Sequence, residues 1–516
     1  MAPFAFRELT PTDFLRRSAD VYGDQVAVVD GDLRLSYRAL HDRSAAFTGV
    51  LAVRGVGPGD RVAVLCVNSH VMLEMHNGVP MRGAVLVPLN TRLSVDEMVH
   101  IVEHSGSRLL VATPELVDRA RTVAQRSGVP LLEAGPGSPY ELALRTAEPR
   151  PVPCTDERSL IGINYTSGTT GRPKGVMVHH RGAYLQSLGL LVHLRLDSST
   201  RYLWTVPMFH CNGWCLTWAL TAVGAVHVAL RAVDPELIWR LVRDEGITHL
   251  SAAPTVLTMI AEAEGAQGPT PEPRVAVTTG GSPPSPSLLS RMTRVGFDVT
   301  HLYGLTETFG PIAINEWKRE WDDLDDDAQA QLRARQGVGN VVAEPLRVVD
   351  AAGVDVPRDG ETIGEIVVRG NDVMLGYYRD DAATRAVDVD GWFRTGDLAV
   401  QALDGYVEIR DRAKDIIITG GENVASVEVE RAIDSHPDVV ESAVVGVPDD
   451  RWGEVPVAYV TVRAGAVVTA TEVTDHVRAR LAGFKVPRRV VFSDLPKTST
   501  GKIQKQVLRA AEAPTP

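Results

Sequence analysis

The sequence predicts an α/β protein with a large N-terminal domain and a small C-terminal domain. Its 516 residues exceed what one hydrophobic core usually supports, so more than one domain is expected. Short apolar runs alternate with amphipathic segments of helical spacing, which is typical of α/β layers. After Asp411 the pattern changes to a compact succession of strand, helix and strand, which indicates a separate small domain.

The N-terminal domain is predicted to span residues 1–411. Apolar runs predict its strands, at Val62–Val67, Ala84–Leu89, Leu109–Ala112, Leu160–Ile163, Val275–Thr278 and Val299–Leu302. A helix is expected over Pro235–Glu245, which Gly246 ends, and a capping box from Ser94 to Glu97 announces another. Residues 135–153 and 271–286 are rich in Gly and Pro, so both are expected to be surface connections.

The C-terminal domain is predicted to span residues 412–516. A strand is expected over Asp415–Thr419, followed by two glycines, a helix from Val427 and a strand over Ser442–Val447. We find no internal repeat and no low-complexity segment.

Composition excludes several classes of function. A net charge of -12 gives no basic field for nucleic acid, so we expect no such partner. The four cysteines form no CxxC pair, and neither a secretory signal nor an uninterrupted apolar span is seen, so a cytoplasmic protein without a transmembrane segment is expected. The acidic run over residues 320–327 lacks turn glycines, which favours a solvated face over a metal site.

The segment 165–175, YTSGTTGRPKG, carries the strongest chemical signal. It follows an apolar run and combines three glycines among residues 165–175 with hydroxyl side chains and Lys174. Glycines allow backbone N–H groups to point at phosphate oxygens, while hydroxyls add neutral donors. A generic flexible loop is the alternative. A nucleoside-triphosphate P-loop is less favoured, because Lys174 is followed by Gly175 rather than by Ser or Thr.

This segment resembles the phosphate loop of the adenylate-forming superfamily, whose members include acyl-CoA synthetases, peptide-synthetase adenylation domains and beetle luciferases. Further motifs of the family follow in order over nearly the whole chain. The resemblance implies a large ATP- and acyl-binding domain with a small mobile lid. It assigns phosphate binding to Thr166, Ser167, Gly168, Thr169, Thr170, Gly171 and Lys174.

Segment 303–307, YGLTE, is similar to the family's adenine and magnesium motif. The resemblance implies that Tyr303 packs on adenine beside Gly304, Thr306 reaches the α-phosphate and Glu307 is the oxygen ligand of Mg²⁺. Residues Gly280, Gly281 and Ser282 would complete the adenine wall and border the acyl group.

Segment 395–397, TGD, would by itself be taken for a turn, and only its order and spacing single it out. By resemblance Asp397 accepts hydrogen bonds from both ribose hydroxyls, which suits a carboxylate with two oxygens. Arg412 would contact the ribose as well.

Segment 496–502, PKTSTGK, resembles the loop that delivers the family's catalytic lysine, here Lys502, whereas Lys497 and Lys505 are expected to be solvated. The family rotates its small domain between two half-reactions. Lys414 matches the hinge of that rotation, and Gly420 and Gly421 match a loop that borders the thiol arm of coenzyme A.

Segment 207–214, PMFHCNGW, resembles the acid pocket of acyl-activating enzymes. His210 is expected to position the acid as a gate rather than to act as an acid or base, and Trp214 to line the pocket with Gly280 and Gly304. Peptide-synthetase domains place an aspartate just inside this pocket, and Phe209 and His210 offer none, which disfavours an α-amino acid.

The resemblance implies an AMP-forming acyl-CoA synthetase that uses ATP, Mg²⁺ and coenzyme A, with a place in fatty acid metabolism. The acid is expected to be a short-to-medium-chain fatty acid or a small aryl acid. The main alternative is an acyl-AMP ligase that loads a separate carrier protein, and a homodimer is also left open. A nucleotide-binding scaffold without catalysis is the remaining alternative, although it would not need Lys502. The C-terminal Pro-Thr-Pro does not match a peroxisomal signal.

Overall fold

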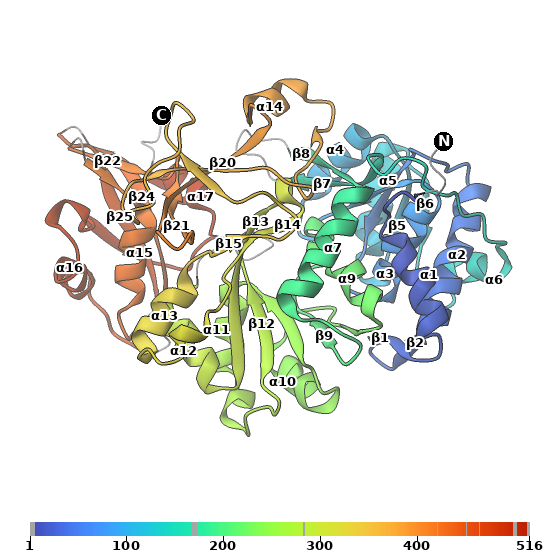
Figure 1. Ribbon diagram of the computed structural model, residues 1–516, viewed down its shortest axis with the longest axis horizontal. Helices are drawn as coiled ribbons and strands as arrows, with labels where there is room; N and C mark the ends of the chain where they lie inside the picture. The colour runs from blue at the N-terminus through green and yellow to red at the C-terminus, as the bar shows by residue number, and fades with distance from the viewer. Residues whose placement is uncertain are drawn as a thin grey trace.

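The computed structural model describes residues 6–166, 173–281, 284–420, 422–449, 451–463, 465–498 and 503–512. Within these ranges the chain forms four β-sheets with helices packed between and around them. Three sheets are built from residues before Ala413 and the fourth from residues after it. The fourth sheet, coloured orange to red, lies at one end of the molecule, and the blue N-terminal strands lie at the other (Figure 1).

A seven-stranded sheet has a parallel centre. In spatial order its strands are β18 (Gly376–Tyr377), β8 (Lys174–His179), β7 (Leu160–Thr166), β4 (Val85–Pro88), β3 (Arg61–Leu65), β5 (Ser107–Ala112) and β6 (Leu131–Glu133). The strands from β7 to β6 are parallel, whereas β8 and β18 are added antiparallel at the edge. Parallel strands need crossover connections, and the helices of this part are α2 (Tyr37–Val53), α3 (His70–Met81), α4 (Val95–Ser105), α5 (Val117–Ser127) and α6 (Pro139–Thr146).

The ends of α4 show how local sequence sets an element. Ser94 accepts a hydrogen bond from the backbone N–H of Glu97, and the Glu97 side chain accepts one from the backbone N–H of Ser94. At the other end Gly106 takes a left-handed conformation with φ of 63°. The capping box predicted from the sequence is therefore confirmed, and the helix begins and ends at residues suited to those places.

A nine-stranded sheet forms the middle of the molecule. In spatial order its strands are β15 (Val338–Gly339), β14 (Gly310–Ile314), β13 (Phe297–Leu305), β12 (Val275–Thr279), β11 (His249–Ala252), β9 (Arg201–Trp204), β10 (Val226–Ala229), β1 (Val26–Asp30) and β2 (Leu33–Ser36). The strands from β13 to β1 are parallel, and β14, β15 and β2 are antiparallel. Its helices are α1 (Thr12–Val21), α7 (His180–Leu194), α8 (Cys211–Trp214), α9 (Leu216–Val223), α10 (Pro235–Asp244), α11 (Pro254–Glu262), α12 (Pro286–Arg294) and α13 (Asp326–Ala334).

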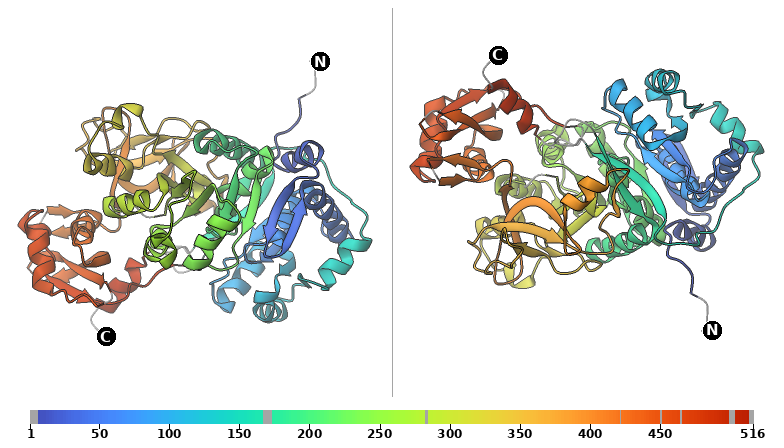
Figure 2. Two further views of the ribbon diagram at one scale, coloured as in Figure 1. Left: turned by 90° about the horizontal axis from the view of Figure 1, so that it is seen from below. Right: turned by 90° about the horizontal axis from the view of Figure 1, so that it is seen from above.

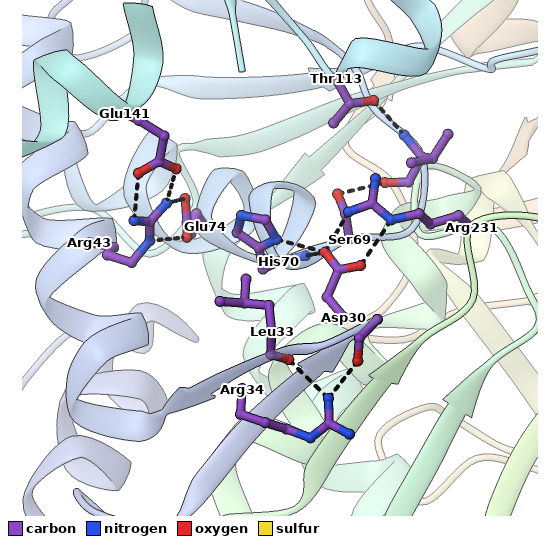
Figure 3. A network of polar contacts seen from close by, with 12 residues as sticks. Asp30, Leu33, Arg34, Arg43, Ser69, His70, Glu74, Thr113, Glu141 and Arg231 are labelled. Atoms are coloured by element: carbon purple, nitrogen blue, oxygen red, sulfur yellow. Dashed lines mark hydrogen bonds and ion pairs between the residues drawn. The ribbon is translucent and has the colours of Figure 1, made fainter. Parts of the chain in front are cut away.

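One hydrophobic core joins the two large sheets. It includes Val64 of β3, Trp204 of β9 and Trp218 of α9, and both tryptophans are fully buried. A polar network close to this core makes a second connection (Figure 3). Asp30 at the end of β1 accepts hydrogen bonds from His70 at the start of α3 and from Arg231, each at 2.6–3.1 Å.

The charge of Asp30 is stabilised by these partners. Burial alone would raise the pKa of Asp30, but the hydrogen bond from His70 and the charge of Arg231 hold it below its ordinary value. Arg231 also pairs with Glu115, which follows β5 of the seven-stranded sheet. The network therefore fixes the two sheets relative to each other.

A third sheet leads towards the small domain. Its strands are β16 (Arg347–Val349), β17 (Gly364–Val368), β20 (Trp392–Gln401), β19 (Asp388–Val389) and β21 (Val407–Arg412), all antiparallel, with α14 (Asp381–Ala386) beside it. Short 3₁₀ turns occur at Pro114–Leu116, Glu264–Gln267, Thr306–Thr308, Arg319–Trp321 and Gly483–Lys485.

The small domain has its own sheet and core. Its strands are β23 (Glu422–Val424), β22 (Ile417–Thr419), β25 (Gly453–Val462), β24 (Val439–Asp449) and β26 (Arg489–Phe492), and its helices are α15 (Ser426–Asp434), α16 (Ala470–Arg478) and α17 (Lys505–Glu512). Its buried apolar residues cluster only with one another, between Ile417 and Leu508. Figure 2 shows this domain beside the larger part in both views. The large and small domains confirm the predicted fold class, while the boundary at 411/412 stays a prediction.

The strands and helices predicted from the apolar runs are present, with ends shifted by a few residues. The expectation that residues 135–153 and 271–286 form only connections is wrong in part, because the first segment contains α6 and the second contains β12. Pro139 stands in the first turn of this helix and Ser138 caps it, so the proline helps to begin α6. In the acidic run, Asp325 caps α13. Among the described residues no cluster of His, Cys, Asp and Glu suits a metal ion.

Candidate active site

The stem of the predicted phosphate loop is an antiparallel strand pair. Thr166, the last residue of β7, is paired with Lys174, the first residue of β8. The two ends of the segment proposed to bind phosphate are therefore held side by side. Ser167, Gly168, Thr169, Thr170 and Gly171 lie outside the described residues.

The predicted magnesium motif is a tight hairpin between β13 and β14. Thr306 and Glu307 stand in its 3₁₀ turn. A β-carbon on Gly304 would lie 2.0 Å from the carbonyl oxygen of Gly310, so only glycine fits where the two strands approach. Thr308 accepts a hydrogen bond from the backbone N–H of Leu305 at 2.9 Å, which closes the turn. Thr306 and Glu307 are therefore held half-exposed at the end of a buried strand.

Asp397 joins the predicted adenine and ribose residues. Its Oδ2 accepts a 2.7 Å hydrogen bond from the Tyr303 hydroxyl, and its Oδ1 lies 3.2 Å from Nε of Arg412. Asp397 on β20 and Arg412 on β21 are paired residues of neighbouring strands. Burial alone would lower the pKa of Arg412, but Asp397 and Asp415 raise it above its ordinary value, so the guanidinium is charged.

The predicted acid pocket contains an unusual stretch of backbone. Five consecutive residues, 211–215, have φ between 43° and 62° and form one left-handed turn. Left-handed backbone costs about 1–2 kcal/mol for each residue with a side chain, and strain of this kind is often found at functional sites. The turn places Trp214 against Gly280, where a β-carbon would lie 3.4 Å from the indole.

Two buried asparagines hold this pocket segment in place. Asn68 donates to the carbonyl oxygens of Trp204 and Val206 and accepts a hydrogen bond from the backbone N–H of Met208, at 2.8–2.9 Å. Asn164 of β7 donates to the side chain of Asn212 at 2.9 Å. The sequence did not single out either asparagine, because both stand outside the recognised motifs.

The acid-pocket and magnesium motifs meet directly. Sγ of Cys211 lies 3.5 Å from Oγ1 of Thr306, and His210 precedes this cysteine, with its Nε2 4.0 Å from the same sulfur. The structure thus brings His210, Trp214, Gly280 and Thr306 together. It does the same for Tyr303, Asp397 and Arg412 on the nucleotide side.

Other predicted residues occupy the joint to the small domain. Lys414 follows β21 and is exposed, and partial desolvation together with the charge of Arg412 lowers its pKa. Gly420 stands in the β22–β23 hairpin, where a β-carbon would lie 2.8 Å from the Trp452 ring. Gly281 is exposed with φ of 96°. Ser282, Gly421 and Lys502 lie outside the described residues.

The expectation that Lys505 is solvated is wrong. Its side chain is 15% exposed, and its ammonium group lies 2.7 Å from Oε1 of Glu430 and 2.6 Å from Oγ of Ser426. Burial would lower the pKa of Lys505, but the carboxylates of Glu430 and Asp411 raise it. Lys497 is one-third exposed and pairs with Glu441 at 2.6 Å. Lys505 therefore fixes the start of α17, just after the loop that contains Lys502.

The donor set around Glu307 suits a hard cation. Oε1 of Glu307 accepts a 2.9 Å hydrogen bond from the Tyr377 hydroxyl, and within the described part of the chain Oε2 accepts none. The Thr306 hydroxyl is the neighbouring oxygen. Mg²⁺ takes oxygen ligands and is commonly held by one or two carboxylates together with substrate phosphates. The residues present therefore fit Mg²⁺.

The motifs predicted to bind a nucleotide and an acid lie side by side, next to a small separate domain, and this arrangement is typical of adenylate-forming enzymes. The model of the AMP-binding enzyme family matches residues 15–378, and that of the AMP-binding enzyme C-terminal domain matches residues 428–502. The chain belongs to this family and, within it, to the acyl-CoA synthetase branch, which confirms the resemblance seen in the sequence.

Named relatives match over nearly the whole chain. An acetate/butyrate–CoA ligase, AAE7, of Arabidopsis thaliana is 41% identical, with 98% of this chain and 95% of the relative covered. A 4-hydroxybutyrate–CoA ligase of Metallosphaera sedula is 42% identical, with 97% and 94% covered. The ATP-bound structure of MatB from Rhodopseudomonas palustris superposes with a TM-score of 0.86 at 30% identity, covering 97% of this chain and 98% of that one.

Proposed function

We propose that the protein activates a short aliphatic carboxylic acid with ATP and passes the acyl group to coenzyme A, with the residues described above in the roles that follow. The chain is an AMP-forming acyl-CoA synthetase, an acid–thiol ligase. A short acid is supported by the relatives, which are named for acetate, butyrate, 2-methylpropanoate and 4-hydroxybutyrate. The sequence left open a short-to-medium-chain fatty acid or a small aryl acid, and the proposal takes the short aliphatic end of that range.

One observation carries the assignment of roles. The contact of Cys211 with Thr306 at 3.5 Å places the acid-pocket segment against the residue proposed to meet the α-phosphate. The reaction needs this juxtaposition, because the carboxylate of the acid must attack that phosphorus atom. Holding the two reactants in line supplies much of the catalysis in such a step.

In the first half-reaction an oxygen of the carboxylate forms a bond to the α-phosphorus, and the bond from that phosphorus to the bridging oxygen of pyrophosphate breaks. The phosphate loop between Thr166 and Lys174 holds the departing phosphates by backbone N–H groups, and Asp397 holds the ribose. Oδ2 of Asp397 accepts one hydrogen bond, Oδ1 is ion-paired with Arg412, and both oxygens keep lone pairs for a ribose hydroxyl. Lys502 is assigned the charge that reduces repulsion between carboxylate and phosphate.

Glu307 would hold Mg²⁺, which when bound offsets negative charge on the phosphates, while Thr306 meets the α-phosphate. The role of this chain is to present an ordered carboxylate oxygen at the edge of the acid pocket. Trp214 sets the depth of that pocket, because its indole lies on Gly280. A hydrophobic wall of this kind discriminates by about 1–3 kcal/mol for each methylene.

In the second half-reaction the sulfur of coenzyme A attacks the acyl carbonyl carbon, and the bond to the AMP oxygen breaks. Rotation of the small domain about Lys414 is proposed to withdraw Lys502 and bring the hairpin that contains Gly420 to the thiol arm. Asp411 supports this proposal, because it accepts a 2.6 Å hydrogen bond from Ser426 across the joint, so rotation must exchange that contact.

Several further expectations remain part of the proposal. Loading of a carrier protein is not favoured, because the named relatives are CoA ligases. No helix of the described residues is long and apolar enough to span a membrane. A cytoplasmic location is supported by the free thiols of the four cysteines, although some relatives carry the word peroxisomal in their names. A homodimer stays a prediction.

The experiment that tests the function is a panel of acids. Pyrophosphate release is measured with acetate, butyrate, 2-methylpropanoate, octanoate and benzoate, with and without coenzyme A, and products are read by mass spectrometry. The proposal predicts release with the short aliphatic acids and an acyl-CoA product only when coenzyme A is present. If benzoate were the only acid of the panel to be turned over, the assigned acid would be contradicted. An acyl-AMP that never reacts with coenzyme A would contradict the assigned acceptor.

A further inference from the structure

Glu307 accepts two hydrogen bonds from one short segment, residues 374–377, which lies outside the motifs recognised in the sequence. The backbone N–H of Met374 donates to the carbonyl oxygen of Glu307 at 2.8 Å, and the Tyr377 hydroxyl donates to Oε1 of the same residue at 2.9 Å. Main chain and side chain of one residue are thus fixed by donors three positions apart. These two hydrogen bonds set both the position of the Glu307 backbone and the direction of its carboxylate.

The segment 374–377 is itself hydrogen-bonded to the stem of the phosphate loop. Gly376 and Tyr377 form β18, which pairs with Met177 and Val176 of β8. The backbone N–H of Tyr378 donates to the carbonyl oxygen of Gly175 at 2.7 Å. Backbone hydrogen bonds therefore join β8 to the segment that holds Glu307.

The ring of Tyr377 makes a contact of its own. Nζ of Lys174 lies 5.0 Å from the ring centroid, within the range of a cation–π interaction. Tyr377 is 7% exposed, so its ring has one fixed place. Its face touches the first residue of β8 while its hydroxyl touches Glu307. One side chain thus links the two phosphate-binding elements.

We propose that Tyr377 is a positioning residue for the metal site: it fixes the rotamer of Glu307 by engaging Oε1 and leaves Oε2 to bind the metal ion that accompanies ATP. The inference rests on the proposed role of Glu307 in metal binding. A free glutamate side chain samples many rotamers, and ordering it on binding costs affinity. A donor that orders it beforehand removes that cost, as preorganisation does elsewhere.

The test is Tyr377→Phe, which removes the hydroxyl and keeps the ring over Lys174. Mn²⁺ replaces Mg²⁺ as a probe, and its binding to the full-length enzyme with α,β-methylene-ATP is measured by electron paramagnetic resonance. We expect Mn²⁺ to bind about tenfold more weakly, which is the effect of losing one hydrogen bond to a charged group. Binding of the analogue without metal and the thermal melting temperature should stay unchanged.

The matched control is Tyr378→Phe. The ring of this neighbouring tyrosine contacts the His104 ring and the Arg379 guanidinium rather than Glu307. Its variant should therefore bind Mn²⁺ as the wild type does. Equal Mn²⁺ affinity of Tyr377→Phe and wild type would overturn the inference. An equal loss in both variants would also overturn it, since the effect would then be general loosening.

A third variant separates this inference from the proposed function. Glu307→Gln should weaken Mn²⁺ binding more than Tyr377→Phe does, and the double variant should bind no more weakly than Glu307→Gln alone, because Tyr377 acts through Glu307. If Glu307→Gln leaves Mn²⁺ affinity unchanged, the metal role of Glu307 fails and the inference with it. If only Glu307→Gln has an effect, the metal role stands and the positioning role of Tyr377 is overturned.

Discussion

The Tyr303 hydroxyl donates a 2.7 Å hydrogen bond to Oδ2 of Asp397, which lies 94 residues further along the chain. Burial and the negative charge of Asp397 raise the pKa of Tyr303 well above its ordinary value, so the phenol remains a donor throughout the working pH range. This bond fixes the carboxylate proposed to hold the ribose. It also joins the nine-stranded sheet to the third sheet at the nucleotide site.

Tyr303→Phe should therefore weaken the binding of ATP. Loss of one hydrogen bond worth about 1–1.5 kcal/mol predicts a KM for ATP that rises about five- to tenfold, with the KM for the acid nearly unchanged. Steady-state pyrophosphate release measures both constants. Tyr406→Phe is the control, because the Tyr406 hydroxyl donates to the carbonyl oxygen of Glu316 instead. A shift in the KM for the acid alone would count against the ribose assignment.

A pair of glycine variants tests the left-handed turn of the acid pocket. Gly213 and Gly137 have φ of 62° and 70°, but a β-carbon on Gly213 would lie 2.7 Å from the Trp204 ring, whereas nothing lies within 4 Å of one on Gly137. Gly137→Ala should cost about 1 kcal/mol of unfolding free energy. Gly213→Ala should cost about 1–3 kcal/mol more through overpacking and should also raise the KM for the acid. Urea unfolding measures the loss of unfolding free energy. An equal loss in both variants would contradict the packing of Gly213 against the Trp204 ring.

A buried carboxyl group predicts an unusual pH dependence of stability. Asp372 is 1% exposed, neither of its oxygens has a hydrogen-bond partner among the described residues, and burial raises its pKa from 3.8 to about 7. Because the folded state binds the proton more tightly than the unfolded state, this stabilising contribution is complete below pH 3.8 and is lost as the pH rises to about 7.

Asp372→Asn should remove that loss. The unfolding free energy of the variant minus that of wild type should rise by about 1.4 kcal/mol for each pH unit between roughly 4 and 7. Above that range the difference should stay constant. Urea unfolding at pH 5, 6, 7 and 8 measures the trend. Asp24→Asn, at a carboxyl that is 95% exposed, is the control and should follow wild type. A constant difference across this pH range would show that Asp372 is ionised throughout.

Asn68→Ala tests how the pocket segment is held. It removes three hydrogen bonds to residues 204–208, so we expect a loss of about 2–4 kcal/mol in stability and an increase in the KM for the acid. Asn77→Ala is matched in burial, but Asn77 donates to Leu73 within α3. That variant should lose stability with no change in the KM for the acid. An unchanged KM for Asn68→Ala would show that the segment is held by other contacts.

The sequence predicted those features that depend on local pattern. Apolar runs predicted β7 and β12, and the glycines and hydroxyls after β7 predicted a loop whose stem, Thr166 paired with Lys174, is present. Ser94 and Glu97 predicted the start of α4 for the same local reason. Fold class followed from the alternation of such elements.

Features that depend on distant contacts could not be predicted. Tyr377 reaches Glu307 across 70 residues from a strand of two residues, too short to leave a pattern. The left-handed turn over residues 211–215 includes two Cys and a Trp, which do not favour that backbone. Lys505 looked solvated because its partners Glu430 and Ser426 stand about 75–80 positions earlier in the chain.

The most direct measurement concerns Lys502, the residue on which the first half-reaction is proposed to depend. Lys502→Ala is compared with Lys497→Ala, a lysine of the same segment that pairs with Glu441. Acyl-AMP formation from butyrate and ATP, and acyl-CoA formation from supplied butyryl-AMP and coenzyme A, are measured separately. The account predicts that Lys502→Ala loses adenylation by about 100-fold or more and keeps thioester formation, while Lys497→Ala keeps both. Full adenylation by Lys502→Ala would contradict it.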